Sequence, residues 1–323
     1  MNASIFKLKP QKASAGYSGQ SPVILSKRWP SAAVGGMAIG LIIAGIALAN
    51  TTMALQRALF GASVWADSLA SLALAVVGTA LIWRGLKAAD PAASILGYAG
   101  GALLWMGFFE WTWRYFSVWL GVDPLMVDGQ AVLPASFLLI QASVCIFLPL
   151  TILSVANKDT RCRMMQWIRR RLRLKSPSTA GNPQRGDSAR VSATETVFVI
   201  WFVYLLNISL YDPRLLGQST QLYYFSLAVI ACWALVLISR LIRIPDPGLS
   251  VRYAIPTAYL LSIIIDGSTM TGLFPAFWIQ PFEYPIAAGS MLAVFAACIY
   301  GLVKASVSRR RKSDTERDLA QSV

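Results

Sequence analysis

Apolar runs of about twenty residues, separated by polar segments, recur along the chain between residues 31 and 304. Each run is long enough for a helix to cross a hydrocarbon core roughly 30 Å thick. The pattern therefore predicts an all-α fold, a bundle of eight transmembrane helices in a polytopic membrane protein. The predicted spans cover approximately residues 31–51, 62–84, 93–119, 134–156, 195–212, 222–242, 252–274 and 284–304.

The composition agrees with a membrane protein, because 56% of the residues are hydrophobic and only 14% are charged. A soluble domain of ordinary composition carries about 25% charged residues. The net charge of +14 arises from basic residues that lie almost entirely in alternate loops and in the two terminal segments. This is the pattern of the positive-inside rule, so we expect no nucleic-acid partner and a lipid bilayer instead. Arg57 and Arg214 are the two basic loop residues on the other side.

With the basic loops inside, an even number of spans places both termini in the cytoplasm, in a plasma membrane that would be the inner membrane of a bacterium. The predicted organisation has five parts. They are a disordered basic tail (1–30), a four-helix membrane half (31–156), a basic cytoplasmic loop and linker (157–194), a second four-helix half (195–304) and a cytoplasmic C-terminal tail (305–323).

The basic segment at residues 161–175 places four apolar residues at near-helical spacing among arginines and lysines. One interpretation is an interfacial helix that binds anionic lipid headgroups with its apolar face toward the bilayer. The other is an ordinary loop that only sets the topology. The four apolar residues are Met164, Met165, Ile168 and Leu172.

Asp266 is the leading candidate for a functional residue, because an ionisable group inside a span is costly. It lies about fourteen residues from the inner end of its span, or roughly 20 Å along a helix. Ser268 and Thr269 follow it after Gly267. Either the helix continues with a buried carboxylate, or it breaks at Gly267 beside a wet cavity. A hydrogen bond from a protonated Asp266 to another helix is a third possibility.

Three more charged residues are predicted near the outer side: Asp67, Glu110 and Arg114. Glu110 and Arg114 are four residues apart, a spacing that favours an ion pair on one helix face. This pair either lies at the headgroup boundary within an aromatic belt or faces the bundle and orients an outward-facing pocket. Asp67 caps the second span, lies at the membrane interface, or joins the same cluster. Other polar residues on this side are Asn207, Asp212 and Glu283.

Enzymatic chemistry is less favoured by this sequence. The chain has no histidine, its four cysteines are isolated, and no glycine-rich phosphate loop or GxSxG motif is present. We therefore expect no metal and no cofactor. The small residues at 35–40 and in GYAGG at 97–101 are typical of close helix packing.

The segment EWTWRYFSVW at 110–119, followed by Pro134, Ala135 and Ser136, resembles a segment in the A subunit of membrane copper monooxygenases. The resemblance covers under a tenth of the chain. The absence of histidine, the eight spans and the long basic loop depart from that family, so no copper site is carried over.

These features favour a transporter or channel-like protein for a small solute or ion, with an outward-facing polar vestibule. Asp266, with Ser268 and Thr269, would bind the solute or ion or couple its transport. The outer mouth would be lined by Glu110, Arg114 and Asp67. The alternative is a non-catalytic subunit or scaffold of a larger membrane complex. Homo-oligomers and membrane partners fit either function.

Overall fold

The computed structural model describes residues 29–156, 163–174, 187–270 and 272–321. Within these residues, eight helical segments are long and apolar enough to cross a membrane, in agreement with the eight apolar runs of the sequence. They are Ser31–Phe60, Val64–Leu86, Ala92–Trp119, Ala135–Ala156, Ser188–Gln218, Thr220–Leu241, Pro247–Thr269 and Pro285–Arg311. Residues 1–28 of the predicted tail and much of the linker lie outside the described residues.

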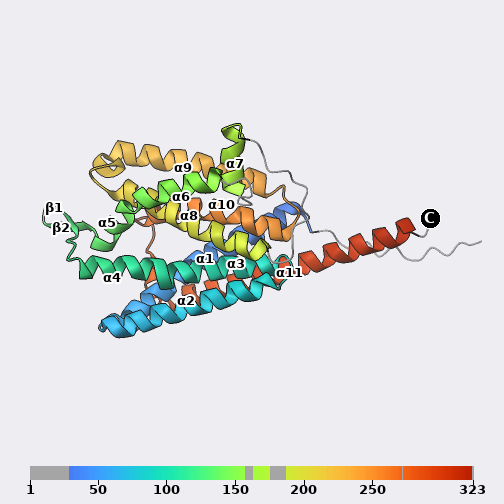
Figure 1. The fold of residues 1–323 in the computed structure, drawn as a ribbon, viewed down its shortest axis with the longest axis horizontal. Coiled ribbons are helices and arrows are strands. Elements are labelled where there is room, and N and C mark those ends of the chain that lie inside the picture. The colour runs from blue at the N-terminus through green and yellow to red at the C-terminus, as the bar shows by residue number, and fades with distance from the viewer. Residues whose placement is uncertain (1–28, 157–162, 175–186, 271, 322–323) are drawn as a thin grey trace, which may run out of the picture.

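The helices run roughly side by side along one axis (Figure 1). In chain order they are α1 (Ser31–Phe60), α2 (Val64–Leu86), α3 (Ala92–Leu104), η1 (Trp105–Glu110), α4 (Trp111–Trp119), α5 (Ala135–Ala142), α6 (Val144–Ala156), α7 (Arg163–Arg171), α8 (Asp187–Tyr211), η2 (Leu216–Gln218), α9 (Thr220–Leu241), α10 (Pro247–Met270), η3 (Phe277–Ile279) and α11 (Pro285–Gln321).

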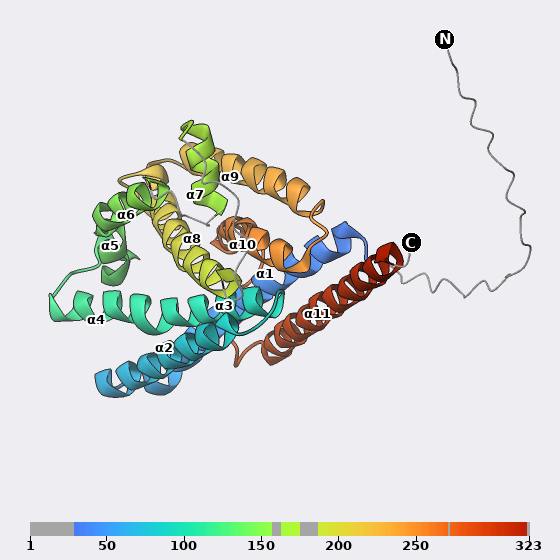
Figure 2. The same cartoon turned by 45° about the vertical axis from the view of Figure 1, so that its right-hand side comes forward.

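A β-hairpin marks one end of the bundle, which we call the hairpin end (Figure 1, left). Its strands, β1 (Leu125–Val127) and β2 (Gln130–Leu133), pair antiparallel. Asp128 and Gly129 join them with φ of 50° and 77°, a left-handed conformation that the Asp-Gly sequence favours in tight hairpin turns. At the opposite end, α11 extends beyond the other helices as a long rod (Figure 2). Much of the predicted C-terminal tail is therefore helical.

Small residues let α3 approach both of its neighbours closely. A Cβ at Gly97 would lie 2.3 Å from the backbone oxygen of Ala189 in α8, and one at Gly78 of α2 would lie 2.8 Å from the backbone oxygen of Gly100. No side chain other than hydrogen fits at such distances. The predicted packing role of the GYAGG segment is confirmed, and α3 lies between α2 and α8.

The third span contains one turn of π-helix, η1, between α3 and α4. Gly107 in this turn lies against the backbone of α2, where a Cβ would meet the backbone of Ser71 and Ala75 at 2.4 Å. A π-turn adds a residue to the helix and changes the direction in which later side chains point. It carries Trp105 and Glu110 at its two ends.

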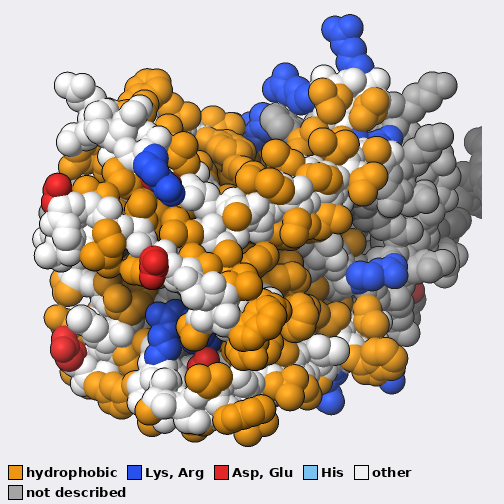
Figure 3. Space-filling view, turned by 60° about the vertical axis from the view of Figure 1, so that its left-hand side comes forward, with side chains coloured by type: hydrophobic (Ala, Val, Ile, Leu, Met, Phe, Trp, Pro, Cys, Tyr) orange, Lys and Arg blue, Asp and Glu red, His pale blue; other side chains and the backbone are white. Residues whose placement is uncertain are grey.

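The main core joins residues of α1, α3, α8, α9, α10 and α11. In the half of α10 near the opposite end, one face is fully buried, at Val251, Ala254, Ile255 and Ala258. The outer surface carries many exposed apolar side chains, and Figure 3 shows hydrophobic groups over most of the face in view. Such a surface suits contact with lipid chains.

The basic segment forms a short helix, α7, so its predicted helical part is confirmed for Arg163–Arg171. Met165 is buried, and Arg169 donates hydrogen bonds to the backbone carbonyls of Val155 and Ala156 at the end of α6. These contacts anchor α7 to the bundle, while Arg170 remains exposed. Residues 161, 162 and 175 of the predicted segment lie outside the described part of the chain.

Candidate functional site

A cavity of about 610 Å³ lies among the helices in the hairpin-end half of the bundle, and we call it the central cavity. Its walls come from α1, α3, η1, β2, α5, α8, α10 and the η3 region. The contribution of β2 and η3 places its mouth near the hairpin end. A hydrogen bond from the Thr51 hydroxyl to the Trp278 carbonyl, 2.8 Å long, ties η3 to α1 at this mouth.

Asp266 faces the central cavity from α10. The helix continues to Met270, so the predicted alternative of a break at Gly267 is not observed. The carboxylate makes no hydrogen bond or ion pair with any residue that the structure describes. The hydrogen bond from the Thr269 hydroxyl, 2.7 Å long, goes to the backbone oxygen of Asp266. The interhelical hydrogen bond considered from the sequence is therefore absent among the described residues.

Thr269 also lines the central cavity, whereas Ser268 does not. The Ser268 hydroxyl donates a 2.8 Å hydrogen bond to the Ile264 carbonyl one turn earlier in α10. Residues three apart share a helix face, and residues two apart do not. The structure therefore brings Asp266 and Thr269 together and separates Ser268 from them.

Glu110 lines the same cavity from η1 and is 6% exposed. Its carboxylate accepts a 3.2 Å hydrogen bond from the guanidinium of Arg57 in α1 and a 3.0 Å bond from the hydroxyl of Tyr204 in α8. Glu110 thus joins three spans. Of the four charged residues predicted from the sequence, Glu110 and Asp266 face one common cavity.

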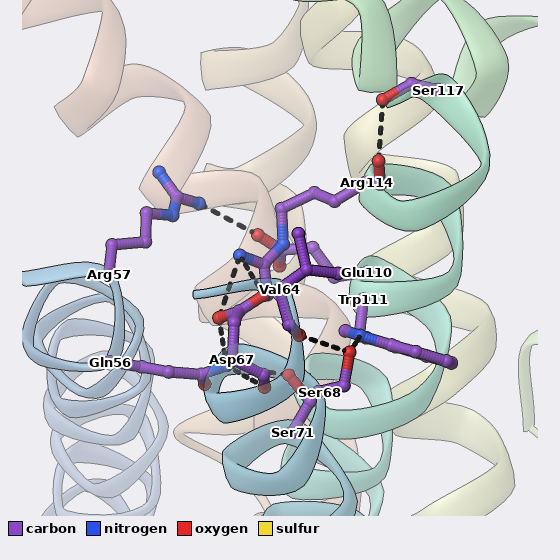
Figure 4. Close-up of polar contacts among 10 residues, drawn as sticks. All are labelled: Gln56, Arg57, Val64, Asp67, Ser68, Ser71, Glu110, Trp111, Arg114 and Ser117. Carbon is purple, nitrogen blue, oxygen red and sulfur yellow. Dashed lines mark hydrogen bonds and ion pairs between the residues drawn. The ribbon is translucent and has the colours of Figure 1, made fainter. Parts of the chain in front are cut away.

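The expected ion pair between Glu110 and Arg114 does not form. Arg114 instead lies 3.3 Å from the carboxylate of Asp67 in α2, and Glu110 pairs with Arg57 (Figure 4). A pair within one helix contributes only about 0.2–0.5 kcal/mol. Contacts with partners on neighbouring helices can outweigh so small a contribution.

Asp67 is the centre of a polar network that also includes Gln56 and Ser71 (Figure 4). The Gln56 amide donates to the Asp67 carboxylate (2.8 Å) and to the Ser71 hydroxyl (2.6 Å). Asp67 is in the first turn of α2, but the N-cap is Ser63, whose hydroxyl accepts from the amide of Ala66. The capping role considered for Asp67 is therefore wrong, and its place in a cluster with Arg114 is observed.

A second cavity of about 550 Å³, which we call the side pocket, lies between α1, α2 and α4. Asp67 and Arg114 line this pocket and not the central cavity. Arg57 also lines it, while its partner Glu110 faces the central cavity. Five of the six predicted site residues, all but Ser268, are thus divided between two cavities, with the Arg57–Glu110 ion pair between them.

Several residues of the central cavity were not predicted as site residues, among them Tyr204, Asn207 and Trp105. The Asn207 side-chain oxygen and the Trp105 indole nitrogen are buried without a hydrogen-bond partner in the described structure. Arg57 was noted only as an outer cation. A signal was present for Asn207, because an amide within an apolar run is uncommon and Tyr211 follows it one turn later.

Comparisons with known proteins found no match to this chain among protein-family models, curated proteins or solved structures. Within the described residues, no group of three or more His, Cys, Asp or Glu side chains is arranged to hold a metal ion. The resemblance of residues 110–136 to a copper monooxygenase segment therefore gives no family assignment.

Proposed function

We propose that this chain is an integral membrane transporter for a small solute, with the central cavity as its binding site. The observation that carries the proposal is that this cavity, of about 610 Å³, brings Asp266 and Glu110 to one place inside the bundle. Ligand pockets commonly have volumes of roughly 300–1,000 Å³. Filled packing around Asp266 would instead have favoured the alternative, a non-catalytic subunit of a larger membrane complex.

The positive-inside rule supports an orientation with the hairpin end outside the plasma membrane. Basic residues gather where helices meet the opposite end, for example Arg84 near the end of α2 and Arg240 near the end of α9. Lys87 is the C-cap of α2, Arg190 lies in the first turn of α8, and Arg243 follows the end of α9. The central cavity then forms an outward-facing vestibule, and both termini are cytoplasmic.

The half of the bundle beyond the cavity is closed. Asp90, just before α3, accepts a 2.6 Å hydrogen bond from Ser188 of α8 and lies 3.6 Å from Arg252 of α10. Its backbone carbonyl accepts a 2.8 Å bond from Arg310 of α11. These contacts join four helices at the opposite end, and the face of α10 beside them is buried among the described residues. One open and one closed end favour a transporter over an open channel, with Asp266 as the binding or coupling carboxylate.

Thiol accessibility tests this proposal. In a chain without its four native cysteines, Ser262→Cys and Thr269→Cys place thiols on the cavity wall, and Ala258→Cys places one in the closed half of α10. A membrane-impermeant thiol reagent applied from the outside should label the first two and not the third. Absence of labelling at both cavity positions would refute the transporter and leave the subunit function.

Movement of the closed half is the second requirement for transport. Reagent applied from the cytoplasmic side should label Ala258→Cys slowly, at a rate set by conformational exchange. Labelling from the outside only, with no reaction from the inside under any condition, would favour a receptor or a subunit with a closed vestibule.

A further inference from the structure

The charge of the central cavity points to the kind of solute it binds. Its described lining includes two acidic residues and no lysine or arginine. Glu110 is compensated by Arg57 at 3.2 Å, but Asp266 has no cationic partner among the described residues. A carboxylate at membrane depth without a partner is unfavourable, and a bound cation would compensate it.

A second, independent feature restricts that cation. The side-chain oxygen of Asn207, on the cavity wall of α8, is buried and accepts no hydrogen bond within the described structure. An amide oxygen accepts hydrogen bonds, so its missing partner is a donor. The Asp266 carboxylate and the Asn207 oxygen, two acceptors without a partner among the described residues, thus call for N–H or O–H donors. A protonated amine supplies such donors and a positive charge, whereas a quaternary ammonium supplies only the charge.

The rest of the wall is apolar and aromatic. Trp105 and Tyr204 pack with ring centroids 5.3 Å apart beside Glu110. Further rings come from other elements around the cavity: Phe137, Tyr211, Tyr259 and Trp278. Aromatic faces attract cations and bind hydrocarbon groups, and a highly hydrated inorganic ion would not use the hydrocarbon contact.

We propose that the central cavity binds a protonated primary or secondary amine with an apolar or aromatic body, with the ammonium at Asp266 and Asn207 and the body against the aromatic wall. This inference rests on the proposed transport function and names its substrate class. Arg57 holds Glu110 and so leaves Asp266 as the acid available to the ligand.

The test measures how far a bound compound slows the labelling of Thr269→Cys by a methanethiosulfonate reagent that bears a trimethylammonium group. It uses the full chain without its native cysteines. The probes are amines from butylamine to 2-phenylethylamine and tryptamine. Matched compounds are 2-phenylethanol, which has no charge, and (2-phenylethyl)trimethylammonium, which has no N–H donor. At about ten times its Kd, a bound amine should slow labelling by roughly tenfold. The alcohol and the quaternary compound should protect at least several-fold less.

Asp266→Asn keeps the shape of the side chain and removes its charge, so it should weaken amine protection by about tenfold or more. Ser268→Ala, beside it on the same helix but outside the cavity, should leave protection unchanged. Because each variant is compared with and without amine, changes in reagent access cancel.

The outcomes separate the two proposals. Labelling of Thr269→Cys without protection by any amine, or equal protection by the alcohol, overturns the amine class and leaves transport standing. Equal protection by the quaternary compound overturns the role of Asn207. Amine protection that survives Asp266→Asn overturns the role of that carboxylate. Absence of labelling at Thr269→Cys and also at Ser262→Cys overturns the proposed function itself.

Discussion

Gly97 sets the distance between α3 and α8, and its replacement by alanine tests whether this close approach is required. A new Cβ would lie 2.3 Å from the carbonyl oxygen of Ala189 and 2.9 Å from its Cα and carbonyl carbon. Favourable contact between such atoms requires about 3.5 Å or more. The obstacle is backbone and cannot rotate away, so the two helices must separate by roughly 1 Å.

The expected cost follows from this geometry. Overpacking at a tight interface destabilises a protein by about 1–3 kcal/mol. A clash with backbone atoms is expected to cost an amount toward the upper end of this range. The higher helix propensity of alanine stabilises the helix by up to about 1 kcal/mol and offsets part of this loss. We therefore expect Gly97→Ala to lower the free energy of unfolding by about 2 kcal/mol. The assay is reversible unfolding in mixed micelles, followed by helical circular dichroism during titration with sodium dodecyl sulfate.

Gly36→Ala is the matched control, because no atom lies within 4 Å of the position where its Cβ would stand. The same change there should stabilise α1 by about 0.5–1 kcal/mol. If Gly97→Ala were neutral or stabilising like Gly36→Ala, the contact between α3 and α8 would be looser than the structure has it.

Three further predictions concern the charged contacts. Arg57→Met should destabilise the protein by about 2 kcal/mol, because the buried Glu110 loses its counter-charge. Adding Glu110→Gln to the same chain should recover most of this loss. A coupling energy near zero in the double-mutant cycle would contradict the ion pair. Asp90→Asn should weaken the closure of the opposite end and speed labelling of Ala258→Cys from the cytoplasmic side, whereas an unchanged rate would remove Asp90 from that closure. We also propose that α7 binds anionic lipid headgroups, so Arg170→Gln should lower retention of phosphatidylglycerol about fivefold in native mass spectrometry, with no change for phosphatidylcholine.

The eight spans were predictable because their signal is local. Length and apolarity act within each run, and the charges of the loops give independent support. The ends were less predictable, since α1 continues to Phe60 and α8 begins at Asp187, before the predicted start at 195. Both extensions are held by tertiary contacts. In α8 the extension includes Ala189, which is buried against Gly97.

The partners of the charged residues were not predictable, because they come from distant parts of the chain. Arg57 and Glu110 are 53 residues apart, and Tyr204 and Glu110 are 94 apart. The i,i+4 spacing of Glu110 and Arg114 was the only local information, and it suggested the wrong pair. The separation of Ser268 from Asp266 could have been predicted from the sequence, since helical periodicity alone places them on different faces.

The same ion pair that was missed from the sequence sets the charge of the central cavity. Glu110 faces this cavity, but its counter-ion Arg57 lines the side pocket, where its side chain is 56% exposed. With Arg57 in place, the cavity presents one uncompensated carboxylate, Asp266. If Arg57 turned toward the side pocket and its solvent, Glu110 would become a second uncompensated carboxylate. The attraction of the central cavity for a cation would then increase. We therefore expect a change at Arg57 in the side pocket to alter the affinity of the central cavity for a cation, although Arg57 does not line that cavity.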